Sequence, residues 1–226
     1  MNPVLKHVRF RRFSTVQLLI ALAALLISAP FVEELEGGHL ILSVFFSLVL
    51  IAAVFAVANR KRSLVIALVL AIPAIAARWL NYLRPDLVHA SVFLVCALVL
   101  LAFVIGHLLY FILHAPVVTV EVLCASIAAY LMLGLMWTVA YWFVDQVTPG
   151  GAFSFNTERG SHSMNGFTGF YISFITLSTV GYGDITPVSQ AARWLAAMEA
   201  MTGLLYVAVL IARLVSLYST PKSDDS

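Results

Sequence analysis

The strongest constraint on the fold is a series of long apolar segments that recurs along the whole chain. A helix needs about 20 apolar residues to cross the roughly 30 Å hydrocarbon layer of a membrane. Six segments approach or exceed this length, at about residues 15–32, 39–58, 63–80, 88–113, 117–144 and 190–217. Of the 226 residues, 62% are hydrophobic and 11% are charged, which would leave a soluble protein with an apolar surface. The sequence therefore predicts an all-α membrane protein with six transmembrane helices.

The distribution of basic residues predicts the orientation of these helices. Lys and Arg are enriched in the cytoplasmic loops of membrane proteins. With six crossings and both termini in the cytoplasm, nine basic residues fall on the cytoplasmic side: Lys6, Arg9, Arg11, Arg12, Arg60, Lys61, Arg62, Arg213 and Lys222. Four fall on or near the outer side: Arg78, Arg84, Arg159 and Arg193. We therefore expect a multi-pass protein of the cell membrane with both termini in the cytoplasm.

The chain is predicted to have two parts, with a boundary near Pro116, a residue that suits the first turn of a helix. Residues 1–114 contain four predicted helices, and residues 115–226 contain two more. The second part also holds the one long connection, at about residues 145–190, and long connections are usually functional. Cys96 and Cys124 lie within apolar segments, so we expect them to pack in helices and to form neither a disulfide nor a metal site.

The long connection contains a segment that is apolar but too short to cross a membrane. Residues 165–178 predict a turn and a short helix, and Thr-Val-Gly-Tyr-Gly-Asp follows at residues 179–184. Non-helical backbone at membrane depth is tolerated only where protein or a water-filled path satisfies its polar groups. Cations can satisfy carbonyl groups in this way, so the pattern indicates a re-entrant helix followed by an ion-binding loop.

The residues of this loop suit a stack of carbonyl rings. Four chains around one axis would place rings of carbonyl oxygens from Thr179, Val180, Gly181 and Tyr182 along that axis. Successive carbonyls can face one axis only if some residues adopt positive φ, which Gly181 and Gly183 do without steric cost. Asp184 would lie at the outer mouth, where a ring of carboxylates concentrates cations.

Residues 176–184, Thr-Leu-Ser-Thr-Val-Gly-Tyr-Gly-Asp, closely resemble the selectivity filter of the tetrameric potassium channel family. Loops of this sequence are an established potassium filter, so this step matches a known case. The resemblance covers about residues 117–217. It implies a homotetramer in which Thr179–Tyr182 bind K⁺ between an outer helix, a pore helix and an inner helix. It also implies that Gly203 is a hinge of the inner helix. The pore-lining gate implied by the resemblance consists of Val207, Ile211 and Val215.

The sequence departs from this family at several positions. Tyr171, with Ile172 beside it, replaces the aromatic pair that braces the filter in many members. Ile175 stands where some members carry a buried carboxylate. The segment 88–113 contains no Lys or Arg, whereas a voltage sensor needs several charges that move through the field. The first four helices are therefore not expected to sense voltage, and the sequence assigns them no other role.

Glu199 is the most unusual residue of the last apolar segment, with about two turns of apolar sequence on either side. Ionisable residues at this depth are rare and usually functional. Because Ile175 leaves the space behind the filter without a carboxylate, we predict that Glu199 hydrogen-bonds Thr176, Ser178 or nearby backbone. Tyr171 completes this predicted filter support. The alternative is a Glu199 that faces an aqueous cavity and attracts cations.

The sequence thus favours passive K⁺ conduction by a homotetramer in membrane lipid, without enzymatic activity, an organic substrate or cofactor, or a nucleic-acid partner. A weakly selective cation channel is the alternative if the reduced aromatic support lets the filter distort. A non-conducting subunit would not need an intact filter. The segment Gly181–Asp184 also fits the Gly-x-Gly-Asp pattern of intramembrane aspartyl proteases. Asp145 is the one candidate for the second aspartate of such a protease, at the outer end of its predicted helix.

Overall fold

The computed structural model describes residues 3–32, 37–58, 61–83, 90–156, 164 and 166–219. Its elements are, in chain order, α1 (Pro3–Val32), α2 (Gly38–Val57), α3 (Lys61–Leu83), α4 (Ala90–Leu113), α5 (Val120–Val147), β1 (Phe153–Phe155), α6 (Gly166–Leu177), β2 (Ile185–Pro187) and α7 (Gln190–Ser219). Among the described residues, six helices are long and apolar enough to cross a membrane, and α6 is a shorter apolar helix. The prediction of a mostly helical protein with six such helices is confirmed.

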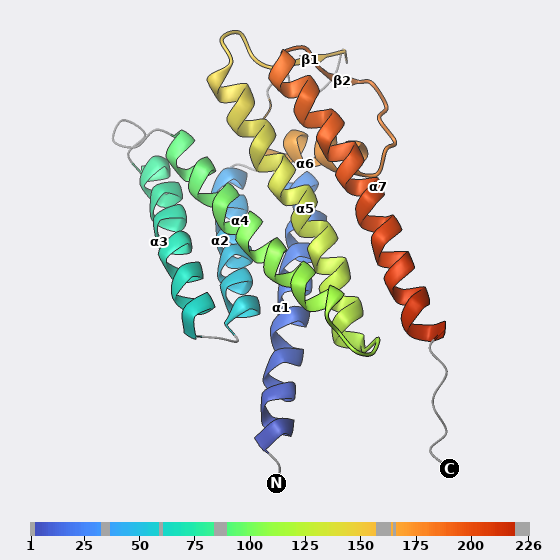
Figure 1. Cartoon of the computed structure of the whole chain (residues 1–226). Coiled ribbons are helices and arrows are strands. Elements are labelled where there is room, and N and C mark those ends of the chain that lie inside the picture. The colour runs from blue at the N-terminus through green and yellow to red at the C-terminus, as the bar shows by residue number, and fades with distance from the viewer. Residues whose placement is uncertain are drawn as a thin grey trace, which may run out of the picture.

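The long helices lie side by side and alternate in direction along the chain, except that α7 follows the short α6 (Figure 1). The start of α1 and the end of α7 lie at the same end of the bundle (Figure 1). Many of the charges behind the predicted orientation belong to residues or side chains outside the described ones: Lys6, Arg9, Arg11, Arg12, Arg60, Arg84, Arg159 and Lys222. The sidedness of the chain in the membrane therefore stays a prediction.

Helix α5 lies at the centre of the fold. It packs against α1 and α4 on one side and against α6 and α7 on the other. Buried Met132 and Leu135 of α5 join the same core as Leu22 of α1, Leu50 of α2 and Leu101 of α4. Because this core is continuous, α5 connects the first four helices to the α6–α7 region. The predicted boundary at residues 114 and 115 falls in the turn between α4 and α5 and stays a prediction.

The beginning of α5 is set by a side-chain cap. Thr119 has an extended backbone, and its Oγ1 accepts a hydrogen bond from the Val122 N–H at 3.4 Å. Threonine in this position satisfies one of the N–H groups that a helix start leaves without a partner. The helix therefore begins at Val120, three residues after the apolar segment begins.

A small two-stranded sheet, which the sequence did not predict, lies beside the upper end of α7 (Figure 1). The strands β1 and β2 are antiparallel, with Phe153 opposite Pro187 and Phe155 opposite Ile185. Phe153 also packs edge-on against Tyr141 of α5, with 5.2 Å between the ring centroids. The sheet therefore fixes both ends of the connection that contains residues 179–184.

Candidate functional site

The backbone of residues 178–184 leaves the end of α6 through a tight set of hydrogen bonds. The Thr179 N–H donates to the Thr176 carbonyl at 2.9 Å. The Ile175 carbonyl accepts from the N–H groups of both Val180, at 2.8 Å, and Gly181, at 3.2 Å. These bonds satisfy the last carbonyls of the helix, which would otherwise lack partners. They also hold the start of the loop in a fixed position relative to α6.

The backbone of this loop alternates in handedness. Thr179, Gly181 and Gly183 have φ values of 60°, 50° and 80°, whereas Val180 and Tyr182 between them do not have positive φ. The expected left-handed conformation of the two glycines is thus present. Thr179 was not predicted to share it, and it is the one non-glycine residue with positive φ in the described part of the chain. Alternation of this kind can turn successive carbonyl groups toward one side of the chain.

The side chains of the loop have no cover within the chain. Residues 178–183 are all exposed, and Val180 and Tyr182 are exposed by 52% and 72%. Large apolar side chains are seldom left this open unless another surface covers them. The loop is therefore held from behind by α6 while its front faces outward from the subunit.

The far end of the loop is tied to α6 and to the β1 strand. Tyr171 donates a hydrogen bond from its hydroxyl group to Asp184 Oδ2 at 2.7 Å. The Asn156 N–H donates to the Asp184 carbonyl at 2.7 Å, and its side-chain amide donates to the Gly183 carbonyl at 3.2 Å. Tyr171, predicted as an aromatic brace, thus acts on the loop through its hydroxyl group. Asn156 was missed because it lies 27 residues from Gly183 in the sequence.

The Tyr171 hydroxyl group is a stable donor at neutral pH. Partial burial raises its pKa to about 12, and the carboxylate of Asp184 contributes to the same shift through the hydrogen bond and its charge. The proton therefore stays on Tyr171 over the physiological range. This bond holds Asp184 at a fixed angle beside the loop.

Glu199 is fully buried and reaches α6, but its partners differ from those predicted. Ser173 Oγ lies 2.6 Å from Glu199 Oε1, and the hydroxyl group of Tyr141 donates a short hydrogen bond to Glu199 Oε2. Thr176 and Ser178 were the predicted partners. Ser178 instead donates to the Phe174 carbonyl of its own helix at 2.7 Å, and Thr176 interacts with the Tyr141 hydroxyl group.

The register between α6 and α7 explains this correction. The two helices approach each other at the Glu199–Ser173 contact and again at Gly203, whose Cα faces the Leu177 carbonyl. Ser173 precedes Leu177 by four residues, and Glu199 precedes Gly203 by four residues. Because side chains four residues apart lie on the same helix face, the two contacts are one turn apart along both helices. Thr176 lies three residues after Ser173 and reaches Tyr141 rather than Glu199, and Ser178 donates to its own helix.

Three glycines mark the closest contacts around α6. A β-carbon on Gly203 would lie 2.0 Å from the Leu177 carbonyl oxygen, and one on Gly134 would lie 2.5 Å from the Phe174 ring. One on Gly169 would lie 2.2 Å from Nε1 of Trp142. Helix α6 therefore packs against both α5 and α7 at positions that leave no room for a β-carbon. The resemblance to potassium channels implied that Gly203 is a hinge, and this role stays a prediction. The structure shows in addition that Gly203 packs against the Leu177 carbonyl.

The predicted gate residues lie on an exposed face of α7. Val207, Ile211 and Val215 are exposed by 44%, 56% and 57%. Leu205 and Val209, about half a helical turn away, are also exposed, by 60% and 50%, but they border a cavity of about 280 Å³ together with residues of α4 and α5. The predicted gate face thus points away from the rest of the subunit. Among the described residues, no group of three or more His, Cys, Asp or Glu side chains could hold a metal ion.

Comparison with known proteins places the C-terminal half of the chain among ion channels. Residues 117–220 match the family model described as "Ion channel". Over 45 residues, or 20% of this chain and 33% of the relative, the sequence is 49% identical to Protein LctB of Geobacillus stearothermophilus. Protein LctB of Bacillus caldotenax is 47% identical over 45 residues, which are again 20% of this chain and 33% of the relative.

A plant relative extends this comparison to a named potassium channel. Two-pore potassium channel 4 of Arabidopsis thaliana is 43% identical over 47 residues, which are 21% of this chain and 16% of the relative. The chain thus spans a third or less of the length of these relatives. No solved structure matches the chain. The family match over residues 117–220 and the six long apolar helices together support a multi-pass membrane protein with an ion-channel region, similar over a short segment to a named potassium channel.

Proposed function

We propose that this chain is one subunit of a homotetrameric, K⁺-selective channel whose filter is Thr179–Gly183. The alternating handedness at Thr179, Gly181 and Gly183 carries the proposal, because it can aim consecutive carbonyls at one axis. In this arrangement, carbonyl oxygens of Thr179, Val180, Gly181 and Tyr182 replace the water around K⁺. The ion passes through unchanged, so the proposal includes no enzymatic chemistry and no organic substrate or cofactor.

The exposed surfaces of the subunit support assembly around an axis. Only 11% of the α7 span is buried within the subunit, compared with 61% of the α5 span. Exposed apolar residues, including Met201, Leu204 and Val207, lie on the part of α7 that points away from the face packed against α6. Lipid can cover one side of such a helix, whereas the others suit contacts with neighbouring subunits and the pore. Four subunits would also enclose the exposed loop at residues 178–183.

The remaining predicted residues take supporting roles in this proposal. Helix α6 is the re-entrant pore helix, and Asp184 lies at the outer mouth, where Tyr171 holds it. Thr176, Ser178 and Glu199 support the filter from behind, Glu199 through Ser173 and Tyr141. Gly203 is the hinge of the inner helix α7. Both termini lie in the cytoplasm, and the loop at residues 178–184 lies toward the outer side of the cell membrane.

The protease alternative finds no support in the arrangement of its two carboxylates. Asp145 Oδ1 accepts the Ala152 N–H at 2.6 Å, whereas Asp184 Oδ2 accepts from Tyr171. Each carboxylate thus accepts a hydrogen bond from a different partner, and the two are not paired with each other. Asp184 is followed by the β2 strand, whereas the protease pattern requires a helix there.

Reversal potentials of the purified protein in planar bilayers test the function. With KCl on one side and NaCl on the other, the reversal potential should lie close to the value for a membrane permeable to K⁺ alone. Gly181→Ala should abolish this current, because the φ of 50° at this position is strained for any β-carbon. Gly37→Ala, at the start of α2, is a matched control with a positive φ of 87° and should keep the current. A reversal potential near zero would instead support the weakly selective channel, and the absence of any current would contradict conduction.

Thiol accessibility along α7 tests the proposed pore lining. Val207→Cys, Ile211→Cys and Val215→Cys should react with a charged, membrane-impermeant thiol reagent and block most of the current, because these side chains would line an aqueous path. Leu205→Cys should react at least tenfold more slowly, since Leu205 lines the cavity toward α4 and α5. The two native cysteines, Cys96 and Cys124, are replaced by alanine in the background. Equal reaction rates at all four positions would contradict the assignment.

A further inference from the structure

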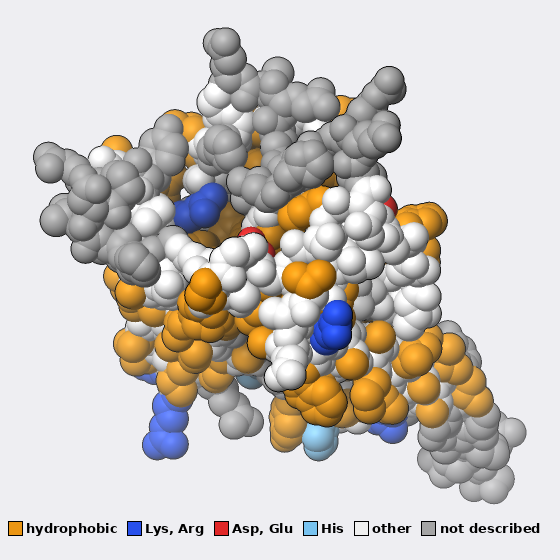
Figure 2. Space-filling view, turned by 90° about the horizontal axis from the view of Figure 1, so that it is seen from above, with side chains coloured by type: hydrophobic (Ala, Val, Ile, Leu, Met, Phe, Trp, Pro, Cys, Tyr) orange, Lys and Arg blue, Asp and Glu red, His pale blue; other side chains and the backbone are white. Residues whose placement is uncertain are grey.

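A second cavity lies between the first four helices, α5 and the start of α6. Its volume is about 450 Å³, which is within the range of small-molecule sites. Arg78 and Asn81 of α3, Phe93 of α4, Trp142 of α5 and Phe170 of α6 contribute to its wall. Figure 2 shows a hollow on the upper face of the molecule, with a basic side chain at one edge and an acidic one at another.

Arg78 is the residue in this cavity that most requires a partner. Its Nη2 donates to Ser43 Oγ at 2.9 Å, and its guanidinium carbon lies 5.2 Å from the centre of the Phe93 ring. Its Nε is buried and has no hydrogen-bond partner in the described part of the chain. A guanidinium group has five N–H donors, and a half-buried cation among apolar side chains is costly without an anion. Arg78 therefore lines the cavity with a charge that no described carboxylate neutralises.

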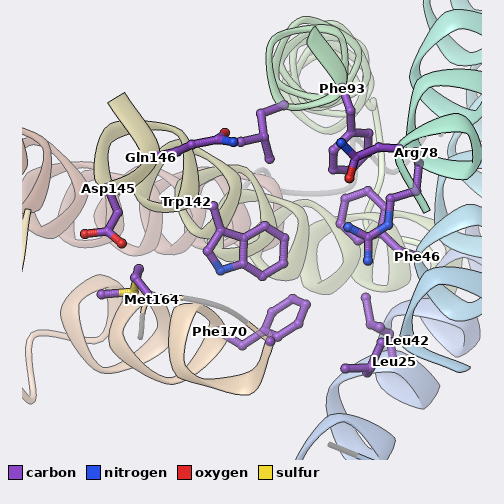
Figure 3. Close-up of a pocket in the computed structure, with 13 residues that line it drawn as sticks. Leu25, Leu42, Phe46, Arg78, Phe93, Trp142, Asp145, Gln146, Met164 and Phe170 are labelled. Atoms are coloured by element: carbon purple, nitrogen blue, oxygen red, sulfur yellow. The ribbon is translucent and has the colours of Figure 1, made fainter. Parts of the chain in front are cut away.

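Asp145 does not neutralise Arg78, although both line the cavity. Figure 3 shows the Arg78 guanidinium group beside Phe46 and Phe93, while Trp142 and Phe170 lie between it and Asp145. Asp145 is engaged by the Ala152 N–H on its own side. The structure pairs Arg78 with no carboxylate among the described residues, so the anion that would complete the site is not supplied by them.

The surroundings of Arg78 suit an amphipathic anion. The wall near Arg78 is apolar, with Leu25, Leu42, Phe46 and Leu94 from three helices. Arg78 lies three residues before the end of the α3 span at Asn81, and Trp79 follows it directly. Tryptophan at the end of a spanning helix is typical of the membrane–water interface, the level at which phospholipid head groups lie. A free anion would use the charge of Arg78 but would leave this apolar wall uncovered.

We propose that the Arg78 cavity binds a phospholipid, with the phosphate group on the Arg78 guanidinium and the first part of an acyl chain against the apolar wall. An arginine can hold a phosphate through two parallel N–H donors of its planar guanidinium group. A lipid in this position would contact α3, α4 and the start of α6 at once. The first four helices would thus hold a lipid that stabilises the pore helix, a role that their sequence alone does not reveal.

Lipid binding to the delipidated protein in detergent tests this inference, independently of ion conduction. Native mass spectrometry and thermal unfolding are followed during titration with phosphatidylglycerol, with diacylglycerol of the same chains, and with inorganic phosphate. We expect phosphatidylglycerol to bind at least tenfold more tightly than diacylglycerol and to raise the unfolding temperature. Equal binding of the two lipids would overturn the role of the phosphate. Full stabilisation by inorganic phosphate would overturn the lipid in favour of a free anion.

Variants locate the site. Arg78→Gln should weaken phosphatidylglycerol binding at least tenfold, and Arg78→Lys should retain part of it, because lysine keeps the charge but loses the paired donors. Arg193→Gln, at an exposed arginine near the same end of the molecule but outside the cavity, should bind like the wild type. Unchanged binding by Arg78→Gln would overturn the site. If that variant does not fold, the comparison of the three ligands on the wild-type protein still decides the inference.

Discussion

Replacing Gly203 by alanine is expected to destabilise the subunit by about 3 kcal/mol or more and to reduce K⁺ current strongly. The new β-carbon would lie 2.0 Å from the Leu177 carbonyl oxygen and 3.0 Å from the carbonyl carbon. Both are backbone atoms, so no side chain can rotate away. Either α7 must move away from the end of α6, or the last turn of α6 must distort. Overpacking that shifts the backbone typically costs about 1–3 kcal/mol, and this contact is closer than most.

A matched variant separates this packing effect from the general effect of adding a methyl group to a helix. Gly106 lies inside α4, and a β-carbon there would meet nothing within 4 Å. Alanine is favoured over glycine in a helix by about 1 kcal/mol, so Gly106→Ala should be neutral or stabilising. Thermal unfolding in detergent and current in bilayers are compared for both variants.

The two roles of Gly203 predict different results in this experiment. If the glycine serves only as a hinge, Gly203→Ala should unfold at the wild-type temperature and change only the fraction of time that the channel is open. If close packing matters, the unfolding temperature should fall together with the current. Wild-type stability in Gly203→Ala would therefore contradict the packing role.

The parts of the fold that depend on local sequence were predictable. A run of about 20 apolar residues can satisfy its backbone hydrogen bonds within a membrane by forming a helix. All six such runs are helices in the structure. The short helix α6 followed from a run too brief to cross, and positive φ at Gly181 and Gly183 followed from the absence of a side chain. Each of these predictions needs only neighbouring residues.

The parts that depend on contacts between distant segments were not predictable. The pairing of β1 with β2 joins residues 30 to 34 positions apart, and their three-residue strands carry no clear pattern. The partners of Glu199 depend on the register of α7 against α6, which the sequence leaves open. The small residues Gly134, Gly169 and Ser173 gave a weak signal, because small side chains often mark close helix contacts in membranes. That signal does not say which helices meet.

The proton count around Ser173 indicates how Glu199 is bound. Ser173 Oγ lies 2.7 Å from the Gly134 carbonyl and 2.6 Å from Glu199 Oε1, yet its hydroxyl group has one proton. The Gly134 carbonyl has no proton to offer, and Thr138 also donates to it at 2.9 Å. Both contacts of Ser173 are satisfied if Ser173 donates to the carbonyl and a protonated Glu199 donates to Ser173. The Tyr141 hydroxyl group then donates to the other carboxyl oxygen of Glu199.

Two substitutions at Glu199 should therefore differ sharply. Glu199→Gln keeps one donor for Ser173 and one acceptor for Tyr141, so stability and selectivity should stay close to those of the wild type. Glu199→Ala leaves both hydroxyl groups without this partner and opens a cavity at a fully buried position, which should cost about 3–5 kcal/mol. The loss should appear as a lower unfolding temperature and as unstable or absent K⁺ current, because Ser173 lies four residues before the end of α6. A carboxylate that attracted cations from an aqueous cavity would behave differently: Glu199→Gln would then reduce the conductance as much as Glu199→Ala while stability stayed unchanged. That pattern would show that the buried network of Glu199, Tyr141 and Ser173 does not support the pore helix.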